Sequence, residues 1–464
     1  GGDGKPTGYE IDNSLRFNND DSAYMQYTPS SASSSRTKWT WSGWIKRGHE
    51  AVDENNDYHR FFCVDADINN YIITGFNISG AFNVTARNSN TQVLKFETGA
   101  GQFRDHSAWY HIVMAYDSTQ STARNRFRVY FNGVEDTRAL ATTPSENLEL
   151  TVLNTSEHNI GRDNHSGTTY YYDGYMSEVH FVDGTQYAAS DFGEFNDNGV
   201  WIPKEADVTY GTNGFKLEFK NSGALGTDTS GNGNNFTANN LTAQDNTTDT
   251  PTNNFCTLNP LDNYFQAATF AEGNTKITTN ASNYSASSST IGVANGKWYF
   301  EAKATDVHDS LIGVSGQTET SSTNGLGQNA NQVGYLSSGN ARKGGSDTST
   351  GYDSYTDGDI IGVALDIDNS KIYFSKNGTY QASGDPANNS NGFALTDVAS
   401  TSTGFYTPSV GDNGGSAAIW EMNFGNAPFT ISSSNADANG YGSFEYAVPS
   451  GFYSLCTKNL AEFG

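Results

Sequence analysis

Residues 39–45 read Trp-Thr-Trp-Ser-Gly-Trp-Ile, a run in which large aromatic side chains alternate with small ones. Successive side chains of a β-strand point to opposite faces, so this alternation predicts a strand that packs one face on a core. No stretch of useful length shows helical periodicity. Strand-like runs recur at short spacing, at residues 109–116, 126–131, 298–302, 360–365 and 371–375. The chain is therefore predicted to be all-β.

The size and composition of the chain suit two such domains. Its 464 residues are enough for two or three domains, each with its own core. Only 35% of the residues are hydrophobic, but 13% are aromatic, and 49 glycines with many Asn, Ser, Thr and Asp residues supply turns. A disordered chain would hold few aromatic residues. We therefore expect two β-sandwiches in tandem.

The boundary between them is predicted from a change in composition. Between residues 220 and 262, Gly, Asn, Thr and Asp replace the apolar runs, and Pro251 and Pro260 lie in the same stretch. This composition is typical of a linker. The expected organisation is an N-terminal arm over 1–13, a first sandwich over 14–219, a closing strand and linker over 220–262, and a second sandwich over 263–464.

A shared turn motif links the two halves. In each half a strand, a polar loop and a second strand lead to an Asn-Gly pair, Asn132-Gly133 in the first and Asn377-Gly378 in the second. Asn-Gly favours the type I′ turn, whose twist matches that of paired strands. We predict a tight hairpin turn at both pairs and a common sandwich plan.

Charge and cysteine content exclude several partners. The chain has 51 acidic and 26 basic residues, and its net charge of −25 repels nucleic-acid phosphates and anionic membranes. No apolar run approaches the length that spans a bilayer, so membrane insertion is not expected either. Cys63, Cys256 and Cys456 are too few and too scattered for a disulfide scaffold or a zinc site, and we expect buried thiols.

Motifs for catalysis are missing. Sandwich glycosidases place two carboxylates on one strand face, and the run Glu10-Ile11-Asp12 begins in that way, but no second Glu follows it. No Gly-x-Ser-x-Gly elbow, Walker loop or His-Glu-x-x-His helix occurs. We therefore predict that the chain is not an enzyme, with a polysaccharide depolymerase as the alternative.

Several stretches of the chain resemble two known domain families. Those similar to the concanavalin A-like (laminin G-like) domains of marine phage and prophage proteins are residues 14–24, 39–47, 172–184 and 211–241. Those similar to a SPRY domain are residues 296–301, 312–314, 357–366 and 406–411. The resemblance implies antiparallel sandwiches of the jelly-roll type, a structural role in a virion and no catalytic residues.

Binding residues are expected where aromatic and polar groups adjoin. Sugar rings stack on aromatic rings, and sugar hydroxyls donate hydrogen bonds to the side-chain oxygens of Asp and Asn. The first such region is residues 161–172, in which Tyr171 is better explained as a core residue; its candidates are Asp163, Asn164, His165, Tyr170 and Tyr172. The second is a long loop over residues 324–355; its candidates are Tyr335, Arg342, Tyr352 and Tyr355.

The sequence also contains candidate ligands for a metal ion. Asp65, Asp67 and Asn69 alternate in a way that offers oxygen ligands to Ca²⁺, whereas Asx turns explain the same residues more simply. No other cofactor is expected.

The predicted function combines these observations. We expect a bacteriophage virion protein, a tail fibre, appendage or capsid decoration, that lies on the virion surface as a homo-oligomer or in several separate copies. It is expected to bind either host-surface polysaccharide or other virion proteins. A bacterial surface adhesin is the remaining alternative.

Overall fold

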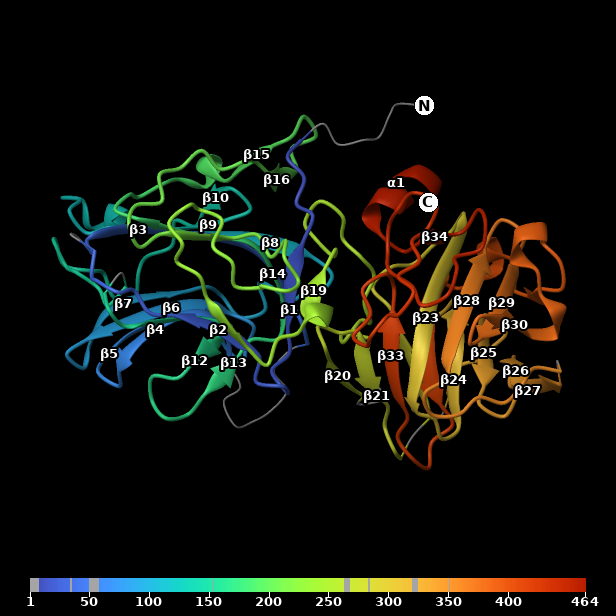
Figure 1. The fold of residues 1–464 in the computed structure, drawn as a ribbon. Coiled ribbons are helices and arrows are strands. Elements are labelled where there is room, and N and C mark those ends of the chain that lie inside the picture. The colour runs from blue at the N-terminus through green and yellow to red at the C-terminus, as the bar shows by residue number, and fades with distance from the viewer. Residues whose placement is uncertain are drawn as a thin grey trace. The chain divides into compact units, whose positions relative to one another are not determined.

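The computed structural model describes residues 8–33, 36–49, 58–152, 154–262, 268–282, 284–318, 324–349 and 351–464. Contacts divide the chain into two compact units, Lys5–Thr252 and Asn253–Gly464. Each unit contains two large, mainly antiparallel sheets (Figure 1). The predicted all-β fold with two sandwich domains is therefore confirmed.

The first unit consists of two stacked sheets, and Figure 1 shows them as layers. The eight-stranded sheet has the order β10-β9-β8-β3-β14-β1-β19, with β17 beside β14. Its strands are β1 (Ser14–Phe17), β3 (Lys38–Arg47), β8 (Trp109–Asp117), β9 (Phe127–Phe131), β10 (Val134–Glu135), β14 (Gly174–Asp183), β17 (Phe215–Leu217) and β19 (Asn246–Thr247).

The seven-stranded sheet of this unit has the order β18-β2-β11-β4-β5-β6-β7. Its strands are β2 (Tyr24–Tyr27), β4 (His59–Asp67), β5 (Asn70–Phe76), β6 (Phe82–Asn88), β7 (Thr91–Glu97), β11 (Glu157–Ile160) and β18 (Thr237–Asn239). Two short hairpins complete the unit: β12 (Arg162–Asp163) with β13 (Tyr170–Tyr171), and β15 (Gly193–Phe195) with β16 (Trp201–Pro203).

Strand β3 shows why the alternation of residues 39–45 predicts the fold. Trp39 and Trp41 are fully buried in the core between the sheets. Trp44, which points the other way, is also buried, in a smaller cluster with Ile11, Trp109 and Tyr175. Both faces of this central strand are therefore covered, the second one by residues that include part of the predicted N-terminal arm.

The stretch 220–262, predicted to hold a closing strand and a linker, contributes two strands to the first sandwich. Strand β18 pairs with β2 and β19 pairs with β1, so both extend the sheets of the first sandwich. Polar bonds fix this stretch: the Asp228 carboxylate accepts hydrogen bonds from the backbone N–H groups of Lys216, Ser230 and Asn234. The division between the units falls between Thr252 and Asn253.

The second unit also stacks two sheets. The nine-stranded sheet contains β20 (Thr269–Ala271), β21 (Lys276–Thr278), β23 (Lys297–Asp306), β28 (Ile360–Asp366), β29 (Lys371–Lys376), β30 (Thr379–Tyr380), β31 (Phe393–Ala394), β33 (Ile419–Asn423) and β34 (Tyr453–Ser454). The six-stranded sheet contains β22 (Ser285–Ser288), β24 (Ser310–Ser315), β25 (Gln332–Leu336), β26 (Asn340–Lys343), β27 (Ser346–Ser349) and β32 (Thr407–Asp412).

Helices are few in the described residues. The 3-10 helices are η1 (Ala123–Arg126), η2 (Ala189–Asp191), η3 (Ala243–Asp245), η4 (Gln381–Ser383), η5 (Pro386–Asn388) and η6 (Val398–Ser400). One α-helix, α1 (Thr457–Phe463), lies near the C-terminus of the chain. Within the described part of the chain, no helix has the length and apolar character needed to cross a membrane.

The two Asn-Gly pairs form the predicted tight turns. Asn132 and Gly133 have φ values of 46° and 80° between β9 and β10, and Asn377 and Gly378 have φ values of 48° and 79° between β29 and β30. Positive φ at both central positions is the type I′ geometry, which Asn and Gly tolerate best. The hairpin predicted in each half is confirmed.

Candidate functional site

A carboxylate pair lies where the short hairpin β12–β13 packs against β4. Asp65 lies near the end of β4, Asp163 ends β12, and His165 follows in the hairpin loop. Strand β11 brings them together, because its residue Glu157 pairs with Asp65 and the chain then turns into β12. One potential ligand atom of each of the three residues lies within 4.8 Å of the others.

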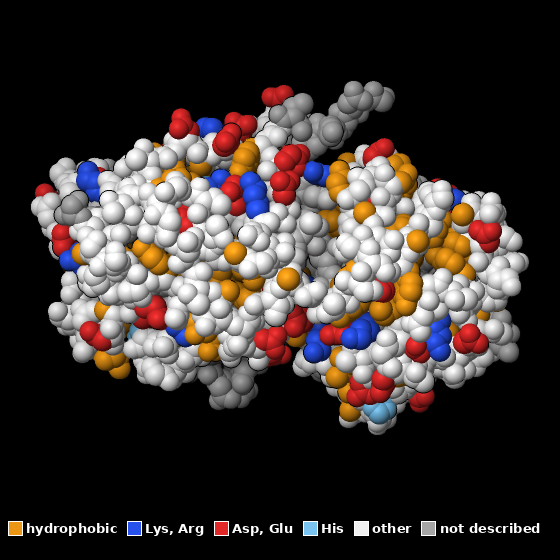
Figure 2. All heavy atoms as spheres, viewed as in Figure 1, with side chains coloured by type: hydrophobic (Ala, Val, Ile, Leu, Met, Phe, Trp, Pro, Cys, Tyr) orange, Lys and Arg blue, Asp and Glu red, His pale blue; other side chains and the backbone are white. Residues whose placement is uncertain are grey.

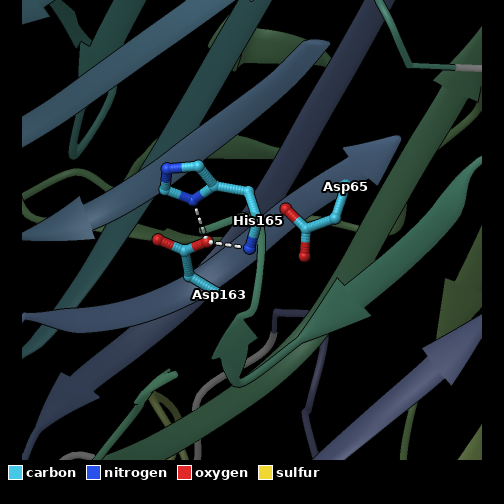
Figure 3. Close-up of side chains that lie close together, drawn as sticks. All are labelled: Asp65, Asp163 and His165. Carbon is cyan, nitrogen blue, oxygen red and sulfur yellow. Dashed lines mark hydrogen bonds and ion pairs between the residues drawn. The ribbon is translucent and has the colours of Figure 1, made fainter. Parts of the chain in front are cut away.

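Hydrogen bonds hold this geometry (Figure 3). The Asp163 Oδ1 atom lies 2.6 Å from His165 Nδ1 and accepts a bond from the His165 backbone N–H at 3.2 Å. The Asp65 Oδ2 atom accepts bonds from Asn159 Nδ2 at 3.0 Å and from the backbone N–H of Asn164 at 3.2 Å. Each carboxylate therefore has one oxygen committed to the hairpin.

The other carboxylate oxygens form no hydrogen bond with the described residues. Asp65 Oδ1 and Asp163 Oδ2 are both buried in this state, and Asp163 as a whole is only 1% exposed. Burial, and then the nearby charge of Asp163, raise the pKa of Asp65 to about 7. A buried polar atom without a partner is costly, so the pair has unused capacity to bind a cation or a hydroxyl group.

Aromatic and basic side chains surround the pair. Arg60 Nε lies 3.9 Å from Asp163 Oδ2, and the Arg60 guanidinium packs over the ring of Tyr58 at 4.3 Å. Tyr170 meets the Tyr58 ring edge to face at 5.1 Å, and the His165 ring lies 3.8 Å from that of Tyr71. The site thus joins carboxylates, an imidazole and partly exposed tyrosine rings.

The first predicted region is largely found in this site. Asp163 and His165 belong to the cluster, Asn164 lies exposed in the same loop, and Tyr170 is partly exposed beside it. Tyr172 is different: it is fully buried in the core, and its hydroxyl donates a hydrogen bond to the Lys46 carbonyl oxygen at 2.8 Å. The prediction that Tyr172 contacts a ligand is therefore wrong.

The metal prediction needs a correction of its ligand set. Asp67 Oδ1 accepts bonds from the Asn69 backbone N–H at 2.7 Å and from Asn70 Nδ2 at 3.1 Å, which makes an exposed Asx turn between β4 and β5. Of the three predicted ligands only Asp65 joins the carboxylate pair, with Asp163 and His165. An imidazole with two carboxylates suits a first-row divalent cation better than Ca²⁺, which prefers oxygen ligands alone.

The second predicted region is not one long loop, because it contains β25, β26 and β27. Tyr335 and Tyr355 are core residues, 0% and 2% exposed, and Tyr352 packs edge to face against Tyr335 at 5.1 Å. Arg342 lies on β26, where its Nε donates to Asp347 Oδ1 at 2.5 Å. Tyr335 and Tyr355 therefore bury their rings in the second core and form no binding surface, whereas Tyr352 packs against that core and stays partly exposed.

Sequence reasoning missed Arg60, Tyr58 and Tyr71 as neighbours of the site. Arg60 and Tyr71 lie on adjacent strands and reach the site only through the pairing of β4 with β5. Arg60 is the second residue of β4 and only 4% exposed, so no local signal in the sequence marks it as part of a site.

We expect the pair to bind a divalent cation weakly. In calorimetric titrations of the full chain with MnCl₂, Asp65→Asn should weaken binding by about tenfold or more, because it removes one of two carboxylate charges. Asp67→Asn, on the same strand but in the exposed turn, is the matched control and should leave binding unchanged. Equal effects of the two substitutions, or no binding by the unmodified chain, would contradict this assignment.

Comparisons with known proteins match each unit separately. A model of the concanavalin A-like lectin/glucanase superfamily, of the laminin G type, matches residues 19–189, and a SPRY domain model matches residues 297–425. No curated protein matches the chain.

Solved structures with similar parts include the SPRY domain of human HERC1, at 16% identity over 32% of this chain and 87% of that one, with a TM-score of 0.26. A native heptameric SAP-like pentraxin from Limulus polyphemus matches at 14% identity over 39% of this chain and 80% of that one, with a TM-score of 0.26. Residues 19–189 are therefore similar to concanavalin A-like, laminin G-type domains, and residues 297–425 are similar to SPRY domains.

Proposed function

We propose that the chain is a non-catalytic attachment protein on the surface of a bacteriophage particle, as a tail fibre, appendage or capsid decoration. Its concanavalin A-like domain binds host-surface polysaccharide at the hairpin β12–β13. The observation that carries this proposal is the meeting of Asp65, Asp163 and His165 beside Tyr170. Carboxylates and imidazoles bind sugar hydroxyls directly or through a cation, and tyrosine rings pack on sugar faces.

The particle location is supported by sequence resemblance. Residues 14–24 and 172–184 are similar to stretches of phage and prophage proteins. The charge agrees with display at a surface: the net charge is −25, and acidic side chains are spread over the face in Figure 2 instead of forming one patch. Several copies on one particle, held by other virion proteins or by self-association, multiply a modest affinity.

Binding explains the carboxylate pair better than hydrolysis does. Glycosidases need a sugar and a water molecule between the two carboxyl groups. Asp163 is 1% exposed and accepts a bond from the hairpin loop, so it is poorly placed to attack a sugar ring or to activate a water molecule. A depolymerase would release reducing ends from host polysaccharide, and we expect none from the purified chain.

The proposal predicts competition for host cells. Purified chain added to host cells should reduce adsorption of the phage particles that carry it, and the double substitution N164A/Y170A should weaken this competition by about tenfold, the effect of losing roughly 1.4 kcal/mol of contact energy. The matched control is Tyr380→Phe in the second unit, which should compete like the unmodified chain.

Three results would contradict the proposal. Failure of the chain to bind cells would favour a purely architectural role. Equal competition by N164A/Y170A would place the binding surface elsewhere. Cell binding by a chain that mass spectrometry does not find in purified particles would favour the bacterial adhesin.

A further inference from the structure

A second polar cluster lies buried at one end of the first sandwich, where β3 ends and β4 begins. Arg47 ends β3, His49 follows it closely, His59 begins β4, and His106 and Asp173 come from two further segments. Arg47, His59, His106 and Asp173 are 2%, 1%, 1% and 0% exposed. We call these five residues the histidine cluster.

Basic and titratable side chains lie close together in the histidine cluster. His49 Nδ1 lies 3.5 Å from Asp173 Oδ1, and the rings of His49 and His59 meet edge to face at 5.7 Å. Arg47 Nη1 donates to the Phe103 carbonyl oxygen at 2.5 Å. The cluster thus gathers a permanent cation and three imidazoles at one buried end of the sandwich.

His59 is the most constrained member. Neither of its ring nitrogens has a hydrogen-bond partner among the described residues. Among the described residues, the charged groups that act on it most are Arg47, His49, His106 and Arg60, which are cations or become cations in acid. Burial, and then these neighbours, hold the pKa of His59 well below its usual 6.5. Burial, Arg47 and His49 lower the pKa of His106 to about 3, against the opposing effects of a hydrogen bond with the Gly48 backbone and of the Asp105 charge.

We propose that the histidine cluster is an acid-sensitive device that opens this end of the sandwich when the surroundings acidify. His59 and His106 are buried beside Arg47, so both rings stay neutral in the closed cluster. When the end opens, both rings are exposed to water and take up protons at their ordinary pKa. Proton uptake therefore favours the open form.

The direction of the pH effect follows from linkage. A histidine whose pKa is lowered in the folded state stabilises that state at pH values above the unfolded pKa, and this contribution is lost as the pH falls through about 6.5. At about pH 5, protonation of each ring increases the equilibrium constant for opening by roughly 30-fold, and protonation of both rings increases it by roughly 10³-fold.

Opening would also disturb the carboxylate pair formed by Asp65 and Asp163. Arg60, which follows His59 directly, lies 3.9 Å from Asp163 Oδ2. Acid would then release a ligand bound at the hairpin β12–β13. This consequence rests on the proposed function, whereas the opening itself is measured without any ligand.

Hydrogen exchange of the full chain, followed by mass spectrometry at about pH 7.5 and about pH 5 and corrected for intrinsic exchange, tests the device. Backbone amides of residues 44–48, 59–62 and 104–107 should lose about 10³-fold of their protection in acid. Amides of β23 and β28 in the second unit should lose far less.

Substitutions identify the histidines responsible. His59→Gln and His106→Gln should each reduce the loss of protection by about 30-fold, and either variant alone is informative if the other does not fold. His308→Gln, whose side chain is 46% exposed in the second unit, is the control. The proposal is overturned if both cluster variants lose protection as the unmodified chain does, or if the loss is equal in both units.

Discussion

Lys46→Met should lower the free energy of unfolding of the first unit by about 3–5 kcal/mol. Lys46 Nζ lies 2.7 Å from Asp249 Oδ2, and the two side chains are 1% and 2% exposed. Asp249 Oδ1 also accepts a bond from Trp109 Nε1 at 3.2 Å. Removing only the lysine takes the Lys46 charge away from a buried carboxylate, and this is more costly than losing both members of the pair.

Calorimetry or urea titration that follows the two units separately measures this effect. The double variant K46M/D249L should recover most of the lost stability, because it buries no charge. Lys95→Met removes a pair with Glu97 whose side chains are 36% and 40% exposed, and it should cost less than about 1 kcal/mol. A loss below about 1 kcal/mol for K46M would show that the segment around Asp249 is not part of the first unit.

That segment also shows where composition misleads. Residues 220–252 are rich in Gly, Asn, Thr and Asp, which is typical of linkers, yet they contribute β18 and β19 to the first sandwich. They are fixed mainly by side chain-to-backbone bonds: Asn234 Nδ2, for example, donates to the Gly214 carbonyl oxygen at 2.8 Å. Asp and Asn serve such packed polar segments and free turns equally well, so composition cannot separate the two.

The strands and tight turns were predictable because their signals are local. Alternation over residues 39–45 and the Asn-Gly pairs depend only on neighbouring residues. The carboxylate pair is different, because Asp65 and Asp163 meet only through the register of β4 with β11. A sequence shows residues with suitable chemistry near Asp163, but it does not show that Asp65 completes the site.

Tyrosines were the least predictable residues. Tyr170 is partly exposed at the site, whereas Tyr172, two residues later, is fully buried. Tyr335 and Tyr355 lie in polar sequence, yet both enter the second core, and the Tyr355 hydroxyl donates to the Ser310 carbonyl oxygen at 2.7 Å. A tyrosine is stable in a core when its hydroxyl finds such an acceptor, so polar neighbours do not indicate exposure.

Trp39→Ala should destabilise the first unit by about 3–5 kcal/mol, the usual cost of truncating a large buried aromatic side chain. Trp39 is 0% exposed, and its ring stacks on those of Tyr116 at 5.5 Å and Phe181 at 5.8 Å. These partners lie on β8 and β14, the strands on either side of β3. The cavity therefore opens at the centre of the eight-stranded sheet, where neighbouring side chains have little room to collapse into it.

Differential scanning calorimetry should show the transition of the first unit about 10 °C lower in W39A, with the transition of the second unit unchanged. Trp420→Ala, at an equally buried position on β33, is the matched variant and should move only the second transition. If either substitution lowered both transitions equally, the two sandwiches would unfold as one cooperative body. Independent shifts are expected because each tryptophan belongs to a separate hydrophobic core.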